Sequence, residues 1–314
     1  MNPKEVWPEL EFEQWKDTCQ TLHMWTQIVG KVRLAQTPWI NHSWHVTLYV
    51  TARGLTTSPF SCGERILEIE FDFVDQRLSI LTGGGERRHV PLKPQPVRDF
   101  YRAVMAALKE LGCEPKFSTL PNEIPDAIRF EEDEKHCAYD PEYANRFWRI
   151  LLQTQRVFTE FRSHFIGKCS PMHFFWGSFD LAVTRFSGRP APSHPGGIPN
   201  LPDRITREAY SHEVSSAGFW PGSSSMREAI FYSYSYPIPE GFAGAKVRPE
   251  GAYFSAAMRE FVFPYAAMRN AASPDEALLE FLQTTYEAAA VLGKWDRTQL
   301  ERGNGPLPSA AHSR

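Results

Sequence analysis

The sequence predicts an α+β protein made of two tandem, diverged repeats. Each repeat is expected to contain a helix, three or four antiparallel strands and a second helix, and the two repeats are expected to pack as a pseudo-twofold pair. Three observations predict this architecture. Apolar residues recur every three or four positions in four segments, they alternate with polar residues in several others, and the two halves of the 314-residue chain resemble each other.

The resemblance between the halves indicates an internal duplication. When residues 15–51 are placed over 148–184 without a gap, eight of the 37 positions are identical. Chance pairing gives about two identities, because a typical residue recurs at roughly one position in seventeen. Both copies carry an apolar helical stripe, then a proline (Pro38 or Pro171), and then a strand with period two.

The first repeat is predicted over residues 1–112. An apolar stripe from Trp15 to Val32 predicts an amphipathic opening helix, and a second stripe from Pro96 predicts a closing helix that stops before Gly112. Alternating apolar and polar residues predict the strands between them, near 46–51, 65–73, 77–81 and 88–93.

The second repeat is predicted over residues 143–302. Its opening helix follows the apolar stripe from Trp148 to Phe165, and its closing helix begins at Ser273, where Pro274 and Glu276 complete a capping box. Alternation predicts the strands between these helices, near 179–184, 229–236, 253–258 and 260–265.

Three segments fall outside these elements. Residues 113–142 are rich in acidic side chains and turn formers, which predicts a solvated linker, and residues 303–314 are predicted to form a disordered tail. Residues 187–227 are rich in Gly, Pro and Ser, which predicts a long inserted loop. Because loops beyond about 15 residues tend to be functional or disordered, two interpretations stay open. The loop is either a lid over an active site or a flap that covers a sheet edge.

The composition excludes several classes of partner. The formal net charge is −3, so no nucleic-acid partner is expected. We expect no membrane association, because no stretch approaches the roughly 20 apolar residues of a membrane helix. The N-terminus lacks the features of a signal peptide, and the five cysteines are scattered, which predicts a cytoplasmic protein with reduced cysteines and no disulfide framework. The oligomeric state stays open.

Polar side chains on the first strand of each repeat indicate where a site could form. His45, Tyr49 and Arg53 share one strand face in the first copy, and Asp180 lies on the corresponding face in the second. If segment 187–227 folds over this face, Asp180 and an imidazole could act as general acid and general base. An arginine could then bind an anionic group of the substrate. If the face is exposed, the pattern is that of an ordinary amphipathic strand. The predicted catalytic residues are His45, Asp180, His212 and Glu213, and the predicted ligand-binding residues are Tyr49, Arg53, Trp176, Arg185 and Trp220.

The spacing His42-x-x-His45 also admits a metal interpretation, with His212 as a third ligand. Residues three apart point to opposite faces of a regular strand, so both could meet one ion only if His42 lies in the preceding turn. The alternatives are one histidine acting alone in a pocket and a hydrogen-bonded structural histidine. A divalent metal is therefore one alternative, and the cofactor is otherwise unknown.

Several runs resemble an uncharacterised bacterial family, a domain of unknown function with cyanobacterial and actinobacterial members. They are residues 22–31, 45–55, 175–181, 207–213 and 219–222. The resemblance extends from about Trp7 to Asp296 and implies membership of that family without implying an activity.

The residues themselves favour a small-molecule enzyme of unknown reaction, with or without a metal. Its site would be lined by His, Asp and Arg, near the junction of the repeats and under segment 187–227. The alternative is a non-enzymatic module that binds a ligand or a protein, because aromatic residues are abundant and no strong catalytic signature is present.

Overall fold

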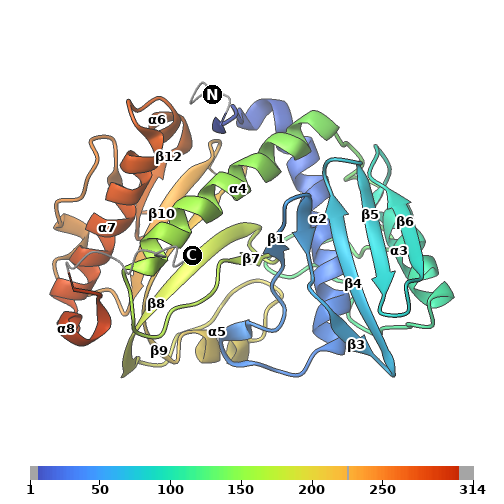
Figure 1. Cartoon of the computed structure of the whole chain (residues 1–314), viewed down its shortest axis with the longest axis horizontal. Helices are drawn as coiled ribbons and strands as arrows, with labels where there is room; N and C mark the ends of the chain where they lie inside the picture. Colours follow the sequence, from blue (N-terminus) through green and yellow to red (C-terminus); the bar gives the residue numbers. More distant parts are fainter. Residues whose placement is uncertain (1–5, 225, 304–314) are drawn as a thin grey trace, which may run out of the picture.

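A computed structural model describes residues 6–224 and 226–303 of the chain. Within these residues the protein is α+β, with seven α-helices and two antiparallel sheets (Figure 1). The predicted fold class is therefore confirmed at this level. The predicted tail lies outside the described residues, except for Gly303.

The first sheet is formed by the first third of the chain and follows the order β1-β2-β4-β5-β6, with β3 paired to β4. Leu67, Ile69 and Phe71 alternate with polar residues along β4 and are fully buried, as the alternation predicts. Most of the predicted first strand is irregular, and only its last part pairs as β1. The strands are β1 (Tyr49–Val50), β2 (Gly54–Thr56), β3 (Phe60–Cys62), β4 (Arg65–Asp72), β5 (Arg77–Thr82) and β6 (Arg87–Pro91).

The second sheet follows the order β11-β12-β10-β9-β8-β7. Its long central strands β8, β9 and β10 are antiparallel neighbours, and they provide the surface on which the candidate site is built. The strands are β7 (His173–Phe175), β8 (Asp180–Pro190), β9 (His212–Trp220), β10 (Ile230–Tyr236), β11 (Tyr253–Ser255) and β12 (Glu260–Pro264).

Each sheet is preceded by one long helix and followed by another. The α-helices are α2 (Phe12–Gln36), α3 (Val97–Glu110), α4 (Pro141–Ser163), α5 (Asp203–Ala209), α6 (Tyr265–Arg269), α7 (Pro274–Leu292) and α8 (Arg297–Leu300). Figure 1 shows α4 running diagonally across one face of the second sheet, with α7 beside it. No helix among the described residues is long and apolar enough to cross a membrane. At α7 the predicted capping box is wrong in one detail, because the Ser273 side chain makes no cap hydrogen bond.

Helix α2 is buried on almost all sides, so the prediction of an amphipathic helix is wrong for its central part. Residues 24–33 are all buried, including Gln27 and Lys31. The reason is its central position, because Trp25 stacks on Phe100 of α3 with the ring centroids 4.5 Å apart, while the second half of the chain covers another side. There Gly30 leaves room for the Trp176 ring, which a Cβ would meet at 2.3 Å.

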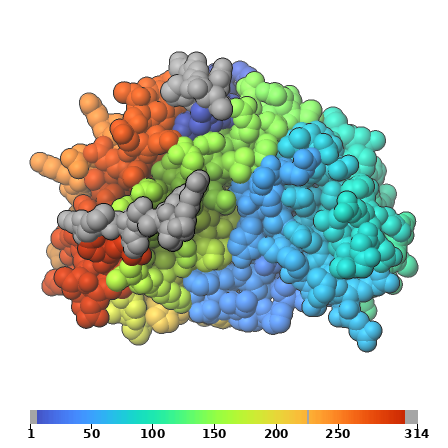
Figure 2. Space-filling model, in the orientation of Figure 1, coloured from blue at the N-terminus to red at the C-terminus, as the bar shows by residue number. Residues whose placement is uncertain are grey.

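The two halves of the chain form one continuous body. The backbones of Leu48 and Phe174 exchange two hydrogen bonds of 2.9 Å, so the edges of the two sheets meet beside β1 and β7. Trp15 of α2 also packs on Phe147 of α4. In the space-filling view of Figure 2 the blue and cyan surface of the first half lies directly against the green surface of α4.

Two segments are more ordered than the sequence predicts. Segment 187–227 is not a single loop, because it holds the end of β8, helix α5 and the whole of β9. Segment 113–142 contains no strand and only the start of α4, but it is not a solvated linker. Phe130 and Asp133 are fully buried, and the Asp133 carbonyl accepts a hydrogen bond from the Arg98 backbone at the start of α3.

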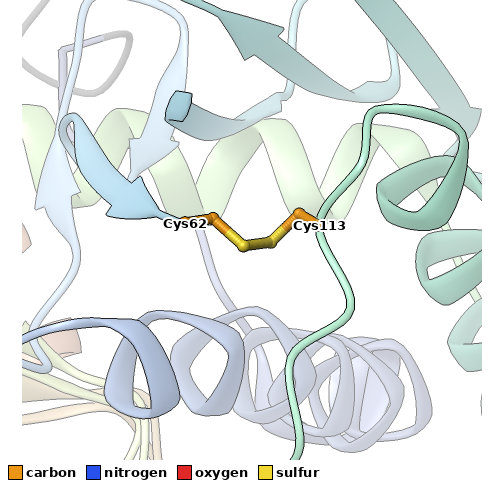
Figure 3. The surroundings of a disulfide bond; sticks show 2 residues. All are labelled: Cys62 and Cys113. Carbon is orange, nitrogen blue, oxygen red and sulfur yellow. A yellow bond between two sulfur atoms is a disulfide. The ribbon is translucent and has the colours of Figure 1, made fainter. Parts of the chain in front are cut away.

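The cysteines also differ from the prediction of a chain without disulfides. Cys62 at the end of β3 and Cys113 after α3 form a disulfide bond (Figure 3). The bond closes a segment with a sequence separation of 51 and ties the edge of the first sheet to the end of its covering helix. Cys19, Cys137 and Cys169 are free.

Candidate functional site

A cavity of about 240 Å³ lies on the face of the second sheet opposite α4 and α7. Strands β8, β9 and β10 form its floor, and α5, with the residues before and after it, covers it. In Figure 1, α5 lies beside the lower ends of β8 and β9. The cavity has further walls at residues 39–46, around the 3₁₀ turn η1 (Asn41–Ser43), at residues 122–123 and at residues 175–178. Segments that are distant in sequence therefore meet around one hollow.

Asp180 and Tyr232 are joined across the floor of this cavity. The Tyr232 hydroxyl donates a hydrogen bond to Oδ2 of Asp180, although β9 lies between their strands. The ring can cross β9 because Gly218 is directly opposite Tyr232, and a Cβ on Gly218 would lie 2.4 Å from the ring. Oδ1 of Asp180 is buried and has no hydrogen-bond partner. One oxygen of the carboxyl is thus fixed by the protein, and the other has no hydrogen-bond partner within it.

A second carboxyl, that of Glu123, closes one end of the cavity. The Ser178 hydroxyl donates a hydrogen bond of 2.6 Å to Oε2 of Glu123. The Glu123 backbone is left-handed, with φ 64°, and its N–H donates to the Pro199 carbonyl oxygen at 2.9 Å. Gln27 of α2 holds the neighbouring residue through two hydrogen bonds of 2.8 Å. The position of Glu123 is therefore set from α2, from the covering segment and from the turn before β8.

Burial perturbs the protonation of these acids. It raises the pKa of Asp180 to about 7, with the Tyr232 hydrogen bond opposing the change and the Glu123 charge adding to it. Burial also raises the pKa of Glu123, and that of Glu260 on β12 to about 7. Near neutral pH the Asp180 carboxyl is consequently poised between its two protonation states, which suits a group that gives and takes protons.

Further hydroxyl groups are paired around the cavity. The hydroxyls of Tyr210 and Tyr234 lie 2.9 Å apart, and those of Thr184 and Ser216 lie 2.9 Å apart. Burial raises the pKa of Tyr210 to about 12 and that of Tyr234 well above its ordinary value. These phenols stay protonated at neutral pH, so they serve as hydrogen-bond donors.

His42 lies in the wall of the cavity but has both ring nitrogens engaged. Nδ1 is 2.9 Å from the Ala209 carbonyl oxygen at the end of α5, and Nε2 is 2.8 Å from Nζ of Lys168. The carbonyl requires a donor at Nδ1, so Nε2 accepts from the ammonium group. Burial and the Lys168 charge lower the pKa of His42, which keeps the ring neutral.

The predicted metal site formed by His42, His45 and His212 does not exist in this arrangement. Nδ1 of His45 lies 3.2 Å from the backbone of Ile40, whereas the His212 ring contacts His42 with the centroids 5.9 Å apart. Across the part of the chain that the structure describes, no three His, Cys, Asp or Glu side chains are grouped to hold an ion. His42 does lie in a turn, as a shared site requires, but its nitrogens face protein partners instead.

Neither of the arginines predicted to hold a ligand reaches the cavity. Arg53 forms ion pairs of 2.9 Å with Asp72 and Asp75 on the first sheet. Arg185 points to the opposite face of β8, where its guanidinium lies over the Phe161 ring and donates to the Phe161 carbonyl oxygen. Residues 180 and 185 are an odd number apart on one strand, so their side chains leave opposite faces of the sheet.

The other predicted site residues divide between the cavity and its surroundings. Trp176 lines the cavity and donates a hydrogen bond of 2.7 Å to the Val46 carbonyl oxygen. Glu213 pairs with Arg189 outside the cavity, and Tyr49 lies against Arg33. Trp220 contacts the Ser178 carbonyl oxygen and lines a neighbouring hollow. Of the predicted site residues, the cavity brings together His42, His45, Trp176 and Asp180.

The sequence prediction missed Glu123 and the pairing of Tyr232 with Asp180. Glu123 lies in a segment without helix or strand, where no periodicity marks a buried residue. Tyr232 belongs to an alternating strand, and its partner 52 residues earlier follows only from the strand order β10-β9-β8. The glycine opposite it, Gly218, is the one local signal of a close approach.

Comparisons with known proteins identify a family but no function. A family model described as a family of unknown function (DUF5996) matches residues 7–302. No curated protein and no solved structure matches the chain. The predicted family membership is thus confirmed over nearly the whole chain.

Proposed function

The chain belongs to the DUF5996 family, whose function is unknown, and from the geometry of its cavity we propose that it is a small-molecule enzyme using general acid–base chemistry. One observation carries this proposal. A buried carboxyl, Asp180, has one oxygen fixed by Tyr232 and the other without a partner in the wall of an aromatic cavity.

In this proposal Asp180 exchanges a proton with the bound molecule through Oδ1. With its pKa near 7, the carboxyl is close to the value at which a group donates and accepts protons with equal ease at neutral pH. Tyr232 stabilises the carboxylate by donating its hydrogen bond, and it fixes the orientation of the carboxyl plane. The charge of Glu123 opposes ionisation of Asp180 and helps to keep its pKa high.

The size of the cavity limits the substrate. Its volume of about 240 Å³ lies slightly below the range of about 300–1,000 Å³ that is usual for ligand pockets. The substrate is therefore expected to be smaller than a typical drug molecule and to carry an apolar portion that fits between the aromatic rings.

The test is conversion of a compound from a complex metabolite mixture, followed by untargeted mass spectrometry. The wild-type protein should deplete one compound and form a product. The Asp180→Asn variant keeps the shape of the side chain and removes the titrating group, so the rate should fall by about 100-fold or more. Glu213→Gln is the matched control, because this carboxyl lies on the neighbouring strand but does not line the cavity.

Two results contradict the proposal. The first is an Asp180→Asn variant that stays folded by circular dichroism and converts the same compound at the wild-type rate. The second is a wild-type protein that binds a compound from the mixture without changing it.

That second result favours the alternative function, a non-enzymatic ligand-binding module. The abundance of aromatic rings around the cavity supports this alternative, because such rings hold ligands without taking part in chemistry. They are Trp39, Trp44, Phe175, Trp176, Phe186, Tyr210, Tyr232 and Tyr234.

We also infer that the two halves arose by duplication of one unit. The gapless identities between 15–51 and 148–184 support this, as does the order of long helix, sheet and helix in both halves. Superposition of residues 12–110 on 141–292 tests the duplication, and unrelated strand connections would count against it.

The cytoplasmic location and the bacterial origin stay predictions. The Cys62–Cys113 disulfide counts against the cytoplasm, because disulfides are rare there.

A further inference from the structure

We propose that the molecule bound in the cavity is an organic cation, an amine or quaternary ammonium compound, held between aromatic rings and the carboxyls of Asp180 and Glu123. This inference deepens the proposed function, because it names the class of ligand for the same site. It rests on the charges around the cavity, on the rings that face it and on the polar atoms left without a partner.

The charges of the cavity wall favour a positive ligand. Asp180 and Glu123 are the acidic residues that line the cavity, and no lysine or arginine is found among the described residues that line it. His42 and His45 are held neutral, since burial lowers the pKa of both rings. A wall of this kind favours cations over anions. A cation stabilises the ionised forms of Asp180 and Glu123, whereas an anion would oppose their ionisation and find no positive charge among the lining residues.

One cation next to the cavity wall, Lys168, is already occupied by protein groups. Lys168 lies behind His42, with Nζ 2.8 Å from Nε2 of that ring and 4.5 Å from the centre of the Phe186 ring. Its ammonium therefore shows that these rings accept a positive charge, while His42 separates it from the cavity.

The aromatic rings supply the second component of a cation site. Rings of Trp44, Trp176 and Tyr234 approach the cavity from three different segments of the chain. An aromatic face carries partial negative charge and binds ammonium groups, most strongly where water is excluded. Rings together with carboxylates form the usual arrangement for recognising alkylated ammonium groups, whereas rings alone would serve a neutral ligand equally well.

An unpartnered buried acceptor indicates where the positive group would lie. Asp180 is 7% exposed, and its Oδ1 has no hydrogen-bond partner. A buried carboxylate oxygen without a donor is costly, and an ammonium N–H supplied by the ligand would satisfy it. Thr206 is 2% exposed, and its hydroxyl in the opposite wall also lacks a partner, which gives the ligand a second polar contact.

The test compares three probes of one shape and different charge, which are benzylammonium, benzyl alcohol and benzoate. Binding of each to the full chain is measured by isothermal titration calorimetry at neutral pH. Benzylammonium should bind roughly ten- to a hundredfold more tightly than benzyl alcohol, and benzoate should bind most weakly. Asp180→Asn should remove the preference for the cation, while Glu213→Gln should retain it. Glu123→Gln, which should weaken the preference, serves as a second variant if Asp180→Asn does not fold.

Three results would overturn the inference. They are binding of benzyl alcohol or benzoate as tight as that of benzylammonium, a preference for the cation that survives in folded Asp180→Asn, and absence of binding by all three probes. These results are independent of the proposed enzymatic function, which is tested by conversion. Conversion of a neutral or anionic substrate would contradict only the proposal that the ligand is a cation. Binding of an amine without any conversion would contradict only the proposal that the protein is an enzyme.

Discussion

The hydroxyl of Tyr232 on β10 donates a hydrogen bond to the carboxyl of Asp180 on β8 by passing over the intervening strand β9. The contact depends on Gly218, the residue of β9 that lies opposite Tyr232. The pair fixes one oxygen of the carboxyl and leaves the other without a partner, so the proposed chemistry depends on a glycine that itself carries no functional group.

A substitution at Gly218 should therefore disturb the site. In Gly218→Ala the new Cβ would lie 2.4 Å from the Tyr232 ring, so the ring must move and the hydrogen bond to Asp180 is lost. Overpacking of this kind costs about 1–3 kcal/mol of the free energy of unfolding, which urea denaturation would measure. Gly83→Ala is the control, because its Cβ would make only ordinary contacts, the nearest 3.5 Å from Ile66. Equal stability of both variants would contradict the account.

The raised pKa of Asp180 predicts how stability depends on pH. The folded protein holds this proton up to about pH 7, whereas the unfolded chain releases it near pH 4. Between these values the folded state binds more protons, so the contribution of Asp180 to the free energy of unfolding falls as the pH rises. The contribution of Glu260, whose pKa is also raised to about 7, falls over the same interval.

The substitution Asp180→Asn separates the contribution of Asp180 from that of Glu260, because it removes only the titration of Asp180. Relative to wild type, the variant should gain stability as the pH rises from about 4 to about 7, by at most about 4 kcal/mol. Urea denaturation at several pH values measures the difference between the two proteins. A difference that stays constant across this interval would show that Asp180 titrates in the usual range.

The sequence predicts those elements whose side chains differ between their two faces. Strand β4 is an example, because Leu67, Ile69 and Phe71 alternate with acidic residues, and helix α3 has one apolar stripe. Strand β9 gives no such signal. Its sequence places Ser215 and Ala217 against the core and Ser216 and Gly218 toward the cavity, so small residues occur on both faces. The prediction of a loop through residues 212–220 is wrong for this reason.

Part of the candidate site could also be predicted from the sequence. His45 and Asp180 lie on corresponding polar faces of the two halves, and the cavity contains both. The partners of these residues could not be predicted, since Glu123 belongs to an irregular segment and Tyr232 approaches through strand order alone. The same limit applies to Arg185, which becomes a core residue because the opposite face of β8 packs against α4.

The Cys62–Cys113 disulfide should contribute measurably to stability. Closing a segment of this length, with a sequence separation of 51, restricts the unfolded chain by about 4 kcal/mol in the chain-entropy description. Cys62→Ser should therefore lower the free energy of unfolding under oxidising conditions, and Cys137→Ser, an exposed free thiol, should not. Five cysteines less the two in the disulfide leave three, so a thiol assay of the unfolded oxidised protein should find three. Five reactive thiols would contradict the disulfide.

The central claim is that Asp180 carries a buried carboxyl that changes its protonation near neutral pH. The most direct measurement is a ¹³C NMR titration of the aspartate carboxyl carbons, with the Asp180 signal assigned by its absence in Asp180→Asn. We expect a midpoint near pH 7 for this signal. A midpoint near 4, the usual value for an exposed aspartate, would contradict it.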